Sequence, residues 1–112
     1  MASVKVEGDS LVLTLSAVEK VGALHGDITV PRAAVLNVRP TSAPLREVRG
    51  LRSPGTGVPW FVALGTYRTL QSRDFCAAYR APGVVVELKG QRYDRLVVST
   101  PDIERILAAF VA

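Results

Sequence analysis

Short apolar segments separated by turns of two or three residues occupy the second half of this chain and restrict it to a β-rich fold. We expect strands at about 60–67, 73–79, 84–89 and 93–99. The residues between them are rich in Gly, Pro, Ser and Gln, which favour turns. Because links this short usually join antiparallel neighbours, the sequence predicts a meander of four strands.

The first 16 residues predict a β-hairpin. Apolar and polar residues alternate over 3–7 and again over 11–15, and the segment between them, Gly8-Asp9-Ser10, favours a tight turn. Alternation with a period of two on both sides of such a turn is typical of two paired strands.

A short helix is expected directly after the hairpin. Ser16 and Glu19 have the spacing of a capping box, in which each side chain binds the backbone amide of the other residue. Gly26 is the expected stop signal. The apolar side chains of this helix would share one face: Val18, Val21 and Leu24.

The middle of the chain predicts a broken strand and then a long loop. Residues 28–31 and 35–38 are β-like, and Pro31 restricts the first of them to a sheet edge or a bulge. Residues 39–59 combine Pro, Gly and Arg without clear periodicity, which indicates a loop of unusual length.

The C-terminus predicts the clearest helix of the chain. Thr100 is the expected N-cap, Pro101 suits the first helical position, and Asp102 complements the positive end of the helix dipole. Four apolar residues then follow at helical spacing: Ile103, Ile106, Leu107 and Phe110. We expect this helix to cover one end of a strongly bent antiparallel sheet.

Length and composition bound the class of protein. The chain has 112 residues, which suits a single domain spanning 1–112, mainly β (α+β). The lone Cys76 excludes an internal disulfide. Because the first residues lack the apolar core of a signal peptide and no apolar run is long enough to span a bilayer, we expect a cytoplasmic protein.

Several stretches of the sequence resemble one family. They are 28–35, 52–59, 64–68, 74–75, Tyr79 and 93–97. On these residues the chain, over about 4–110, resembles the bacterial pleckstrin-homology-like (PH-like) domains of actinobacterial type. The resemblance implies a bent sheet or barrel of about seven strands, capped by a helix from about Asp102, and some such domains assemble into rings. The lipid-binding branch uses basic residues around its first loop, whereas nothing basic lies between Gly8 and Ala17, so this chain departs from the pattern of that branch.

The candidate binding residues are few. Arg46, Arg49 and Arg52 recur every three residues in the expected loop and would share a face if that stretch were helical. They could hold an anion, or they could be solvated separately. Trp60 is either a partner anchor or a residue at the rim of the core. The run from Arg52 to Gly57 lacks the Gly-Lys-Ser/Thr ending of a phosphate-binding loop.

Catalytic, metal and cofactor sites are not predicted. His25 is the only histidine, and Cys76 lies in an expected strand with no base nearby in sequence. The C-terminal acids are spread over strands where they would mostly face water or pair with arginines. We therefore expect that the protein is not an enzyme.

The overall balance of charge and hydropathy favours an interaction domain. Apolar residues make up 48% of the chain, and the formal net charge is +4. So apolar a small domain is expected to bury some of its surface against another subunit. The leading hypothesis is a non-catalytic protein-interaction or assembly domain that forms a homo-oligomer. The alternative is anion binding (nucleic acid, acidic lipid or acidic protein) through residues 39–59, although the arginine content also fits coding from a GC-rich genome.

Overall fold

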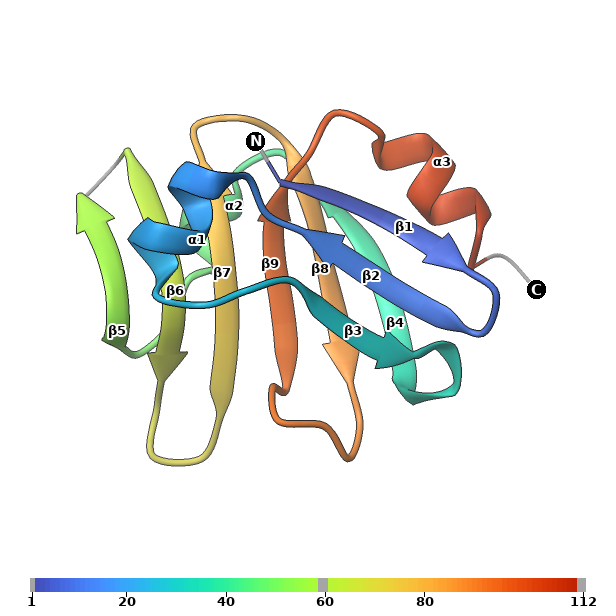
Figure 1. The fold of residues 1–112 in the computed structure, drawn as a ribbon, viewed down its shortest axis with the longest axis horizontal. Coiled ribbons are helices and arrows are strands. Elements are labelled where there is room, and N and C mark those ends of the chain that lie inside the picture. The colour runs from blue at the N-terminus through green and yellow to red at the C-terminus, as the bar shows by residue number, and fades with distance from the viewer. Residues whose placement is uncertain (1, 59–60, 111–112) are drawn as a thin grey trace.

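Two sheets and three short helices form the fold (Figure 1). The computed structural model describes residues 2–58 and 61–110, with the backbone alone described for 52–58. The smaller sheet has the order β1-β2-β3, and its strands are β1 (Ser3–Glu7), β2 (Ser10–Thr14) and β3 (Ile28–Pro31). The larger sheet has the order β4-β8-β9-β7-β6-β5, and its strands are β4 (Val35–Thr41), β5 (Leu51–Val58), β6 (Val62–Arg68), β7 (Arg73–Tyr79), β8 (Gly83–Leu88) and β9 (Arg95–Ser99). The helices are α1 (Ala17–Ala23), α2 (Pro44–Glu47) and α3 (Ile103–Ala108), and a 3-10 turn, η1 (Arg32–Ala34), joins the sheets.

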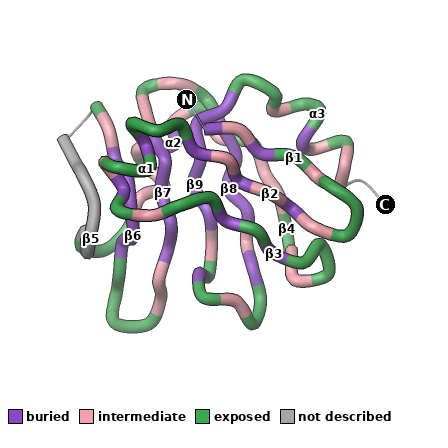
Figure 2. The backbone as a smooth tube through the Cα atoms, viewed as in Figure 1, coloured by how far each residue is buried: buried purple, intermediate pink, exposed green. Residues whose placement is uncertain are grey.

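The core lies between the two sheets. Apolar residues from the inner face of the small sheet meet the inner face of the large one, and Phe75 is the largest side chain among them that is fully buried. Burial alternates along β2 but is nearly continuous along β6, β7 and β9 (Figure 2). The central strands are therefore covered on both faces, and a continuous apolar run in them reflects this double burial.

The N-terminal predictions are confirmed in their local features. β1 and β2 pair antiparallel around the Gly8-Asp9 turn. The Ser16 hydroxyl accepts a hydrogen bond from the Glu19 amide, and the Glu19 carboxylate accepts one from the Ser16 amide. The strand expected to break near Pro31 does so, with Pro31 at the end of β3, an edge strand of the small sheet.

The predicted meander is wrong. β6–β7 and β8–β9 are antiparallel pairs as expected, but β9 lies between β7 and β8 and runs parallel to β7. The link at 80–82 therefore skips one strand, a distance of about 9.6 Å at the usual strand spacing. Four Cα–Cα steps reach about 13 Å, so this short link can span it.

Ser99 holds that crossing in place. Its hydroxyl oxygen accepts a hydrogen bond from the Tyr79 amide at 2.8 Å and donates to the Ala81 carbonyl oxygen at 2.8 Å. One buried hydroxyl at the end of β9 thus binds the end of β7 and the link to β8, which fixes the order of the three strands.

The predicted long loop over 39–59 is also wrong. β4 continues to Thr41, α2 occupies Pro44–Glu47, and β5 extends from Leu51 to Val58 and pairs with β6. The sequence pattern did not predict β5, because glycine, which this strand contains, is depleted in strands and favours turns. A single bent sheet of about seven strands was expected, and the described residues instead form nine strands in two sheets.

The terminal helix is confirmed, although it begins later than expected. α3 starts at Ile103 with Asp102 at the N-cap position, and no side chain caps it. Thr100, the predicted cap, is buried, and its hydroxyl has no hydrogen-bond partner within the described part of the chain. Ile106 is buried in the core, and the helix packs beside β4 and β1 (Figure 1).

Candidate functional site

The arginines predicted to bind an anion do not form a common surface in the structure. Arg46 is exposed on α2, whereas Arg49 follows α2 and its guanidinium binds Asp74. Arg52 belongs to β5, but its side chain is outside the described atoms, as is all of Trp60. Of the two side chains that are described, one is free for a partner and the other is already paired.

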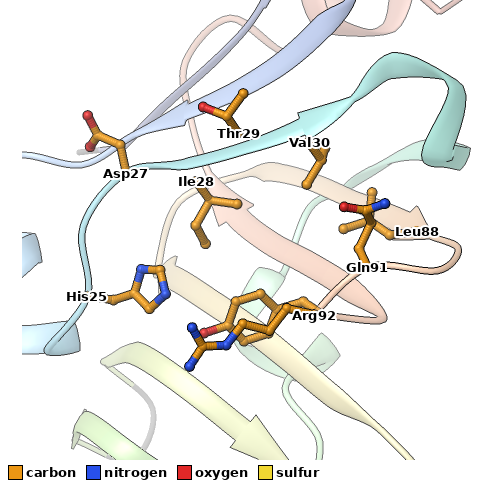
Figure 3. Close-up of a pocket in the computed structure, with 9 residues that line it drawn as sticks. His25, Asp27, Ile28, Thr29, Val30, Leu88, Gln91 and Arg92 are labelled. Atoms are coloured by element: carbon orange, nitrogen blue, oxygen red, sulfur yellow. The ribbon is translucent and has the colours of Figure 1, made fainter.

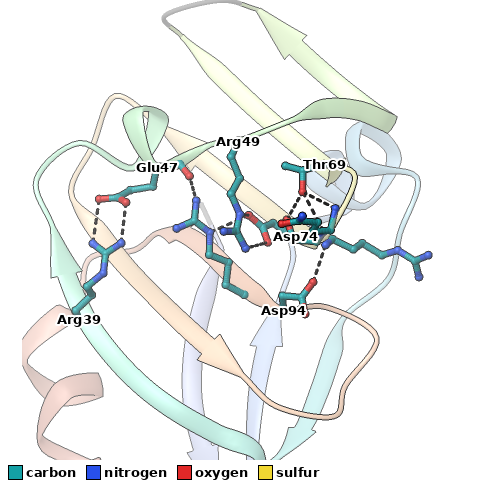
Figure 4. Close-up of polar contacts among 10 residues, drawn as sticks. Arg39, Glu47, Arg49, Thr69, Asp74 and Asp94 are labelled. Atoms are coloured by element: carbon teal, nitrogen blue, oxygen red, sulfur yellow. Dashed lines mark hydrogen bonds and ion pairs between the residues drawn. The ribbon is translucent and has the colours of Figure 1, made fainter.

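Arg49 belongs to a network that fastens α2 to the outer face of the large sheet (Figure 4). The Asp74 carboxylate is completely buried and binds Arg49 at 2.7 Å and Arg95 at 2.8 Å. Glu47 binds Arg39 at 2.8 Å, and its carbonyl oxygen accepts a hydrogen bond from Arg95. Hydrogen bonding to Arg39 lowers the pKa of the Glu47 carboxyl despite its partial burial. The three arginines of the network are each paired with a protein carboxylate, so they are not free to bind an anion.

The other two candidate residues, Cys76 and His25, also pack against the fold. Cys76 lies in β7 on the same outer face, and burial raises the pKa of its thiol to about 12. The thiolate needed for nucleophilic chemistry is therefore absent at neutral pH. His25 lies after α1, where its ring contacts Phe75 with a centroid distance of 5.2 Å. Within the described residues, no three His, Cys, Asp or Glu side chains lie where they could hold a metal ion.

The most unusual surface of the molecule is the outer face of α1. The sequence predicted that Val18, Val21 and Leu24 share one face of this helix. They do, but that face points to solvent: the three residues are 80%, 74% and 68% exposed. We call these three residues the α1 stripe.

The buried side of α1 explains this orientation. Glu19 and Ala23 point inward, and the helix packs on β5 and β6. The Glu19 carboxylate accepts a hydrogen bond from the Tyr79 hydroxyl at 2.7 Å as well as from Ser16. These two polar contacts compensate for burying the carboxylate, and burial together with Glu19 raises the pKa of Tyr79, so the phenol stays a donor. Sequence periodicity alone would have placed the valines inward and the glutamate outward.

Leu24 adds backbone strain to this exposure. It ends α1 in the left-handed conformation, with φ at +52°, and it is the one non-glycine residue with positive φ in the described ranges. This conformation costs a leucine about 1 kcal/mol, and glycine or asparagine usually occupies the position. Both its backbone and its exposed side chain are unfavourable for the isolated domain. Residues that depart in this way from the usual backbone and burial preferences are often found at functional surfaces.

The Glu19 contacts predict how stability depends on pH. Burial alone would raise the pKa of Glu19, but hydrogen bonds from Ser16 and Tyr79 outweigh it, and the pKa falls below its ordinary value of 4.5. A lowered folded-state pKa stabilises the protein above about pH 4.5, and this contribution is lost as the pH falls through the folded-state value.

Glu19→Gln should therefore lower the free energy of unfolding by about 1 kcal/mol at pH 7. The difference in free energy of unfolding between this variant and the wild type should disappear as the pH falls from about 5 to 3. Urea unfolding at each pH measures this difference. Glu7→Gln, an exposed residue of β1, is the control and should track the wild type throughout. A gap that stays constant with pH would show that the charge of Glu19 does not matter.

No helix among the described residues has the length and apolar character needed to cross a bilayer. No family model matches the chain, and neither a curated protein nor a solved structure is detectably similar to it.

Proposed function

We propose that this domain is a non-catalytic self-association module that binds a second copy of itself through the α1 stripe. The observation that carries the proposal is the exposure of Val18, Val21 and Leu24 on one helix face, with Leu24 in a strained backbone conformation. Isolated exposed apolar residues are ordinary, but a helix that turns its apolar face outward and its glutamate inward needs a partner to bury that face.

The charge around the stripe is compatible with a second copy as the occupant. The chain carries a net charge of +4, so two copies repel unless they meet at a neutral surface. The one charged residue on the exposed side of α1 is Lys20, and it pairs with Asp27 at 3.7 Å. The outer face of α1 is therefore a place where two like-charged domains can approach closely.

The size of the stripe predicts a weak association. Burying a Val or Leu side chain contributes about 1.5–3 kcal/mol, so three from each copy provide on the order of 10 kcal/mol before costs. Association costs about 4–15 kcal/mol in lost freedom of motion. With a cost near the lower end of that range, about 4 to 6 kcal/mol is left, so we expect a dissociation constant between about 40 µM and 1 mM, which suits a domain brought to high local concentration.

Sedimentation equilibrium tests the proposal over about 10 µM to 1 mM. The average mass of the wild type should rise toward that of a dimer. The triple variant Val18→Thr/Val21→Thr/Leu24→Asn should remain a monomer, because these changes preserve side-chain shape while removing apolar surface. Asn tolerates the left-handed conformation, so the variant should be no less stable than the wild type.

Leu70→Asn provides the matched control. Leu70 is fully exposed in the turn after β6, away from α1, and replacing it should leave the association unchanged. A wild type that stays monomeric at 1 mM, or a triple variant that associates as well as the wild type, would overturn the proposal.

The PH-like family resemblance is proposed on the residues quoted above, and the mainly β fold with a terminal helix is compatible with it. Anion binding through residues 39–59 has less support, since Arg49 binds Asp74. Adding nucleic acid at low and high salt during the same sedimentation experiment would reveal it, because phosphate contacts weaken steeply with salt.

A further inference from the structure

A second candidate site lies between the small sheet and the loop that joins β8 to β9 (Figure 3). It is a pocket of about 210 Å³. Ile28 and Val30 of β3 form one apolar wall, and Leu88 and Tyr93 form the other. All four are at most 7% exposed, so the core sets the positions of both walls.

The aromatic wall of the pocket is held rigidly. The Tyr93 ring meets the rings of Phe75 and His25 edge-on, with centroid distances of 5.6 and 5.9 Å. Its hydroxyl shares a buried hydrogen bond of 2.9 Å with Thr66. A ring fixed by core contacts and a hydrogen bond need not be ordered when a ligand binds, which lowers the entropic cost of binding.

The charges at the rim leave one cation without a partner. The Asp27 carboxylate accepts a hydrogen bond from the Leu15 amide at 2.8 Å and pairs with Lys20. Arg92 stacks over the Tyr93 ring at 5.7 Å, and it forms no ion pair with any described residue. The acid is thus compensated while the arginine is not, so the rim favours an anion.

His25 adds a directed polar group to the same rim. Its Nδ1 lies 2.8 Å from the Gly26 carbonyl oxygen. A carbonyl oxygen can only accept, so the proton lies on Nδ1, and Nε2 is the nitrogen left for other interactions. In Figure 3 the imidazole and the Arg92 guanidinium lie on the same side of the pocket, with Gln91 at the opposite side.

We infer that this pocket binds a small carboxylate that carries a compact aromatic or branched aliphatic body. Arg92 would hold the carboxylate, because a planar guanidinium matches it with two parallel hydrogen bonds. The apolar body would lie against the small exposed parts of Tyr93, Ile28 and Leu88. At about 210 Å³ the pocket lies below the 300–1,000 Å³ of drug-sized sites, so the ligand is about as large as a single amino acid. The inference does not depend on self-association.

Titration of the full chain with phenylacetate, monitored by amide chemical shifts, tests this inference. Shifts should concentrate on Thr29, Gln91, Arg92 and Tyr93. Phenylacetamide, which has the same body without the charge, should bind at least about tenfold more weakly, because it loses the charge-assisted hydrogen bonds. Repeating the titration at low protein concentration, where the domain is a monomer, separates this result from self-association.

Arg92→Gln should weaken phenylacetate binding by about tenfold or more, whereas Arg46→Gln, an exposed arginine on α2, should leave it unchanged. Equal binding of the acid and the amide, shifts located away from the pocket, or an Arg92→Gln variant that binds like the wild type would each overturn the inference. So would the absence of any shift at millimolar phenylacetate.

Discussion

Gly83→Ala should lower the free energy of unfolding by about 3 kcal/mol or more, one of the two largest single-residue effects that we expect. Gly83 opens β8 and pairs with Ser99 of β9. A Cβ atom at this position would lie 1.8 Å from the Val98 carbonyl oxygen and 2.6 Å from its carbon. Both atoms belong to the backbone of a central strand, so the clash is relieved only by separating β8 from β9.

Gly26→Ala is the matched control. Gly26 lies in the link between α1 and β3, has no positive φ, and a Cβ there would meet nothing within 4 Å. Its substitution should change stability by less than about 1 kcal/mol, with a slight gain from restricting the unfolded chain. Chemical unfolding of the two variants and the wild type measures the difference. A Gly83→Ala variant as stable as Gly26→Ala would mean that β8 and β9 do not pair at Gly83 and Ser99 as described.

Asp74→Asn should be the second most damaging change, with an expected loss of about 3 kcal/mol. The carboxylate is the shared partner of two arginines that come from different segments, Arg49 after α2 and Arg95 in β9. Asparagine keeps the shape but not the charge. The Arg95 side chain is only 13% exposed, so it would be left as a nearly buried cation, while Arg49 is more exposed and can recover hydration.

A surface ion pair supplies the comparison for Asp74. Asp102 pairs with Arg105 one turn along α3, and both side chains are largely exposed. Asp102→Asn should therefore cost less than about 0.5 kcal/mol. A double-mutant cycle between Asp74→Asn and Arg95→Gln should give a coupling energy above about 1 kcal/mol, measured by urea unfolding. Independent, additive effects would show that Asp74 and Arg95 do not form the buried ion pair described above.

The local elements of this fold were predictable from the sequence. The β1–β2 hairpin, the capping box of Ser16 and Glu19, the break at Pro31 and the terminal helix were all indicated by patterns within about ten residues. In each case the stabilising interaction joins near neighbours in the chain. β5 is the exception, because its Pro and Gly residues favour turns and its pairing with β6 overrides that preference.

The candidate sites were only partly predictable. The periodicity of Val18, Val21 and Leu24 correctly gave a shared helix face, but not that it points to solvent. That outcome depends on Tyr79, which lies 60 residues away and binds Glu19 on the inner side of α1. The pocket at Tyr93 left no sequence signal at all, because its walls come from β3 and from the link between β8 and β9.

The sequence by itself determined the N-terminal hairpin, the capped helix α1 and the terminal helix, since these elements rest on contacts between residues close in the chain. The tertiary structure alone decided that β9 inserts between β7 and β8, that the strands divide into two sheets, and that α1 turns its valines outward. A three-residue link is compatible with either a neighbouring or a skipped strand. The strand order depends instead on contacts between residues far apart in the chain. Examples are the Ser99 hydroxyl with Ala81 and the buried Asp74 carboxylate with Arg95, which form only in the folded protein.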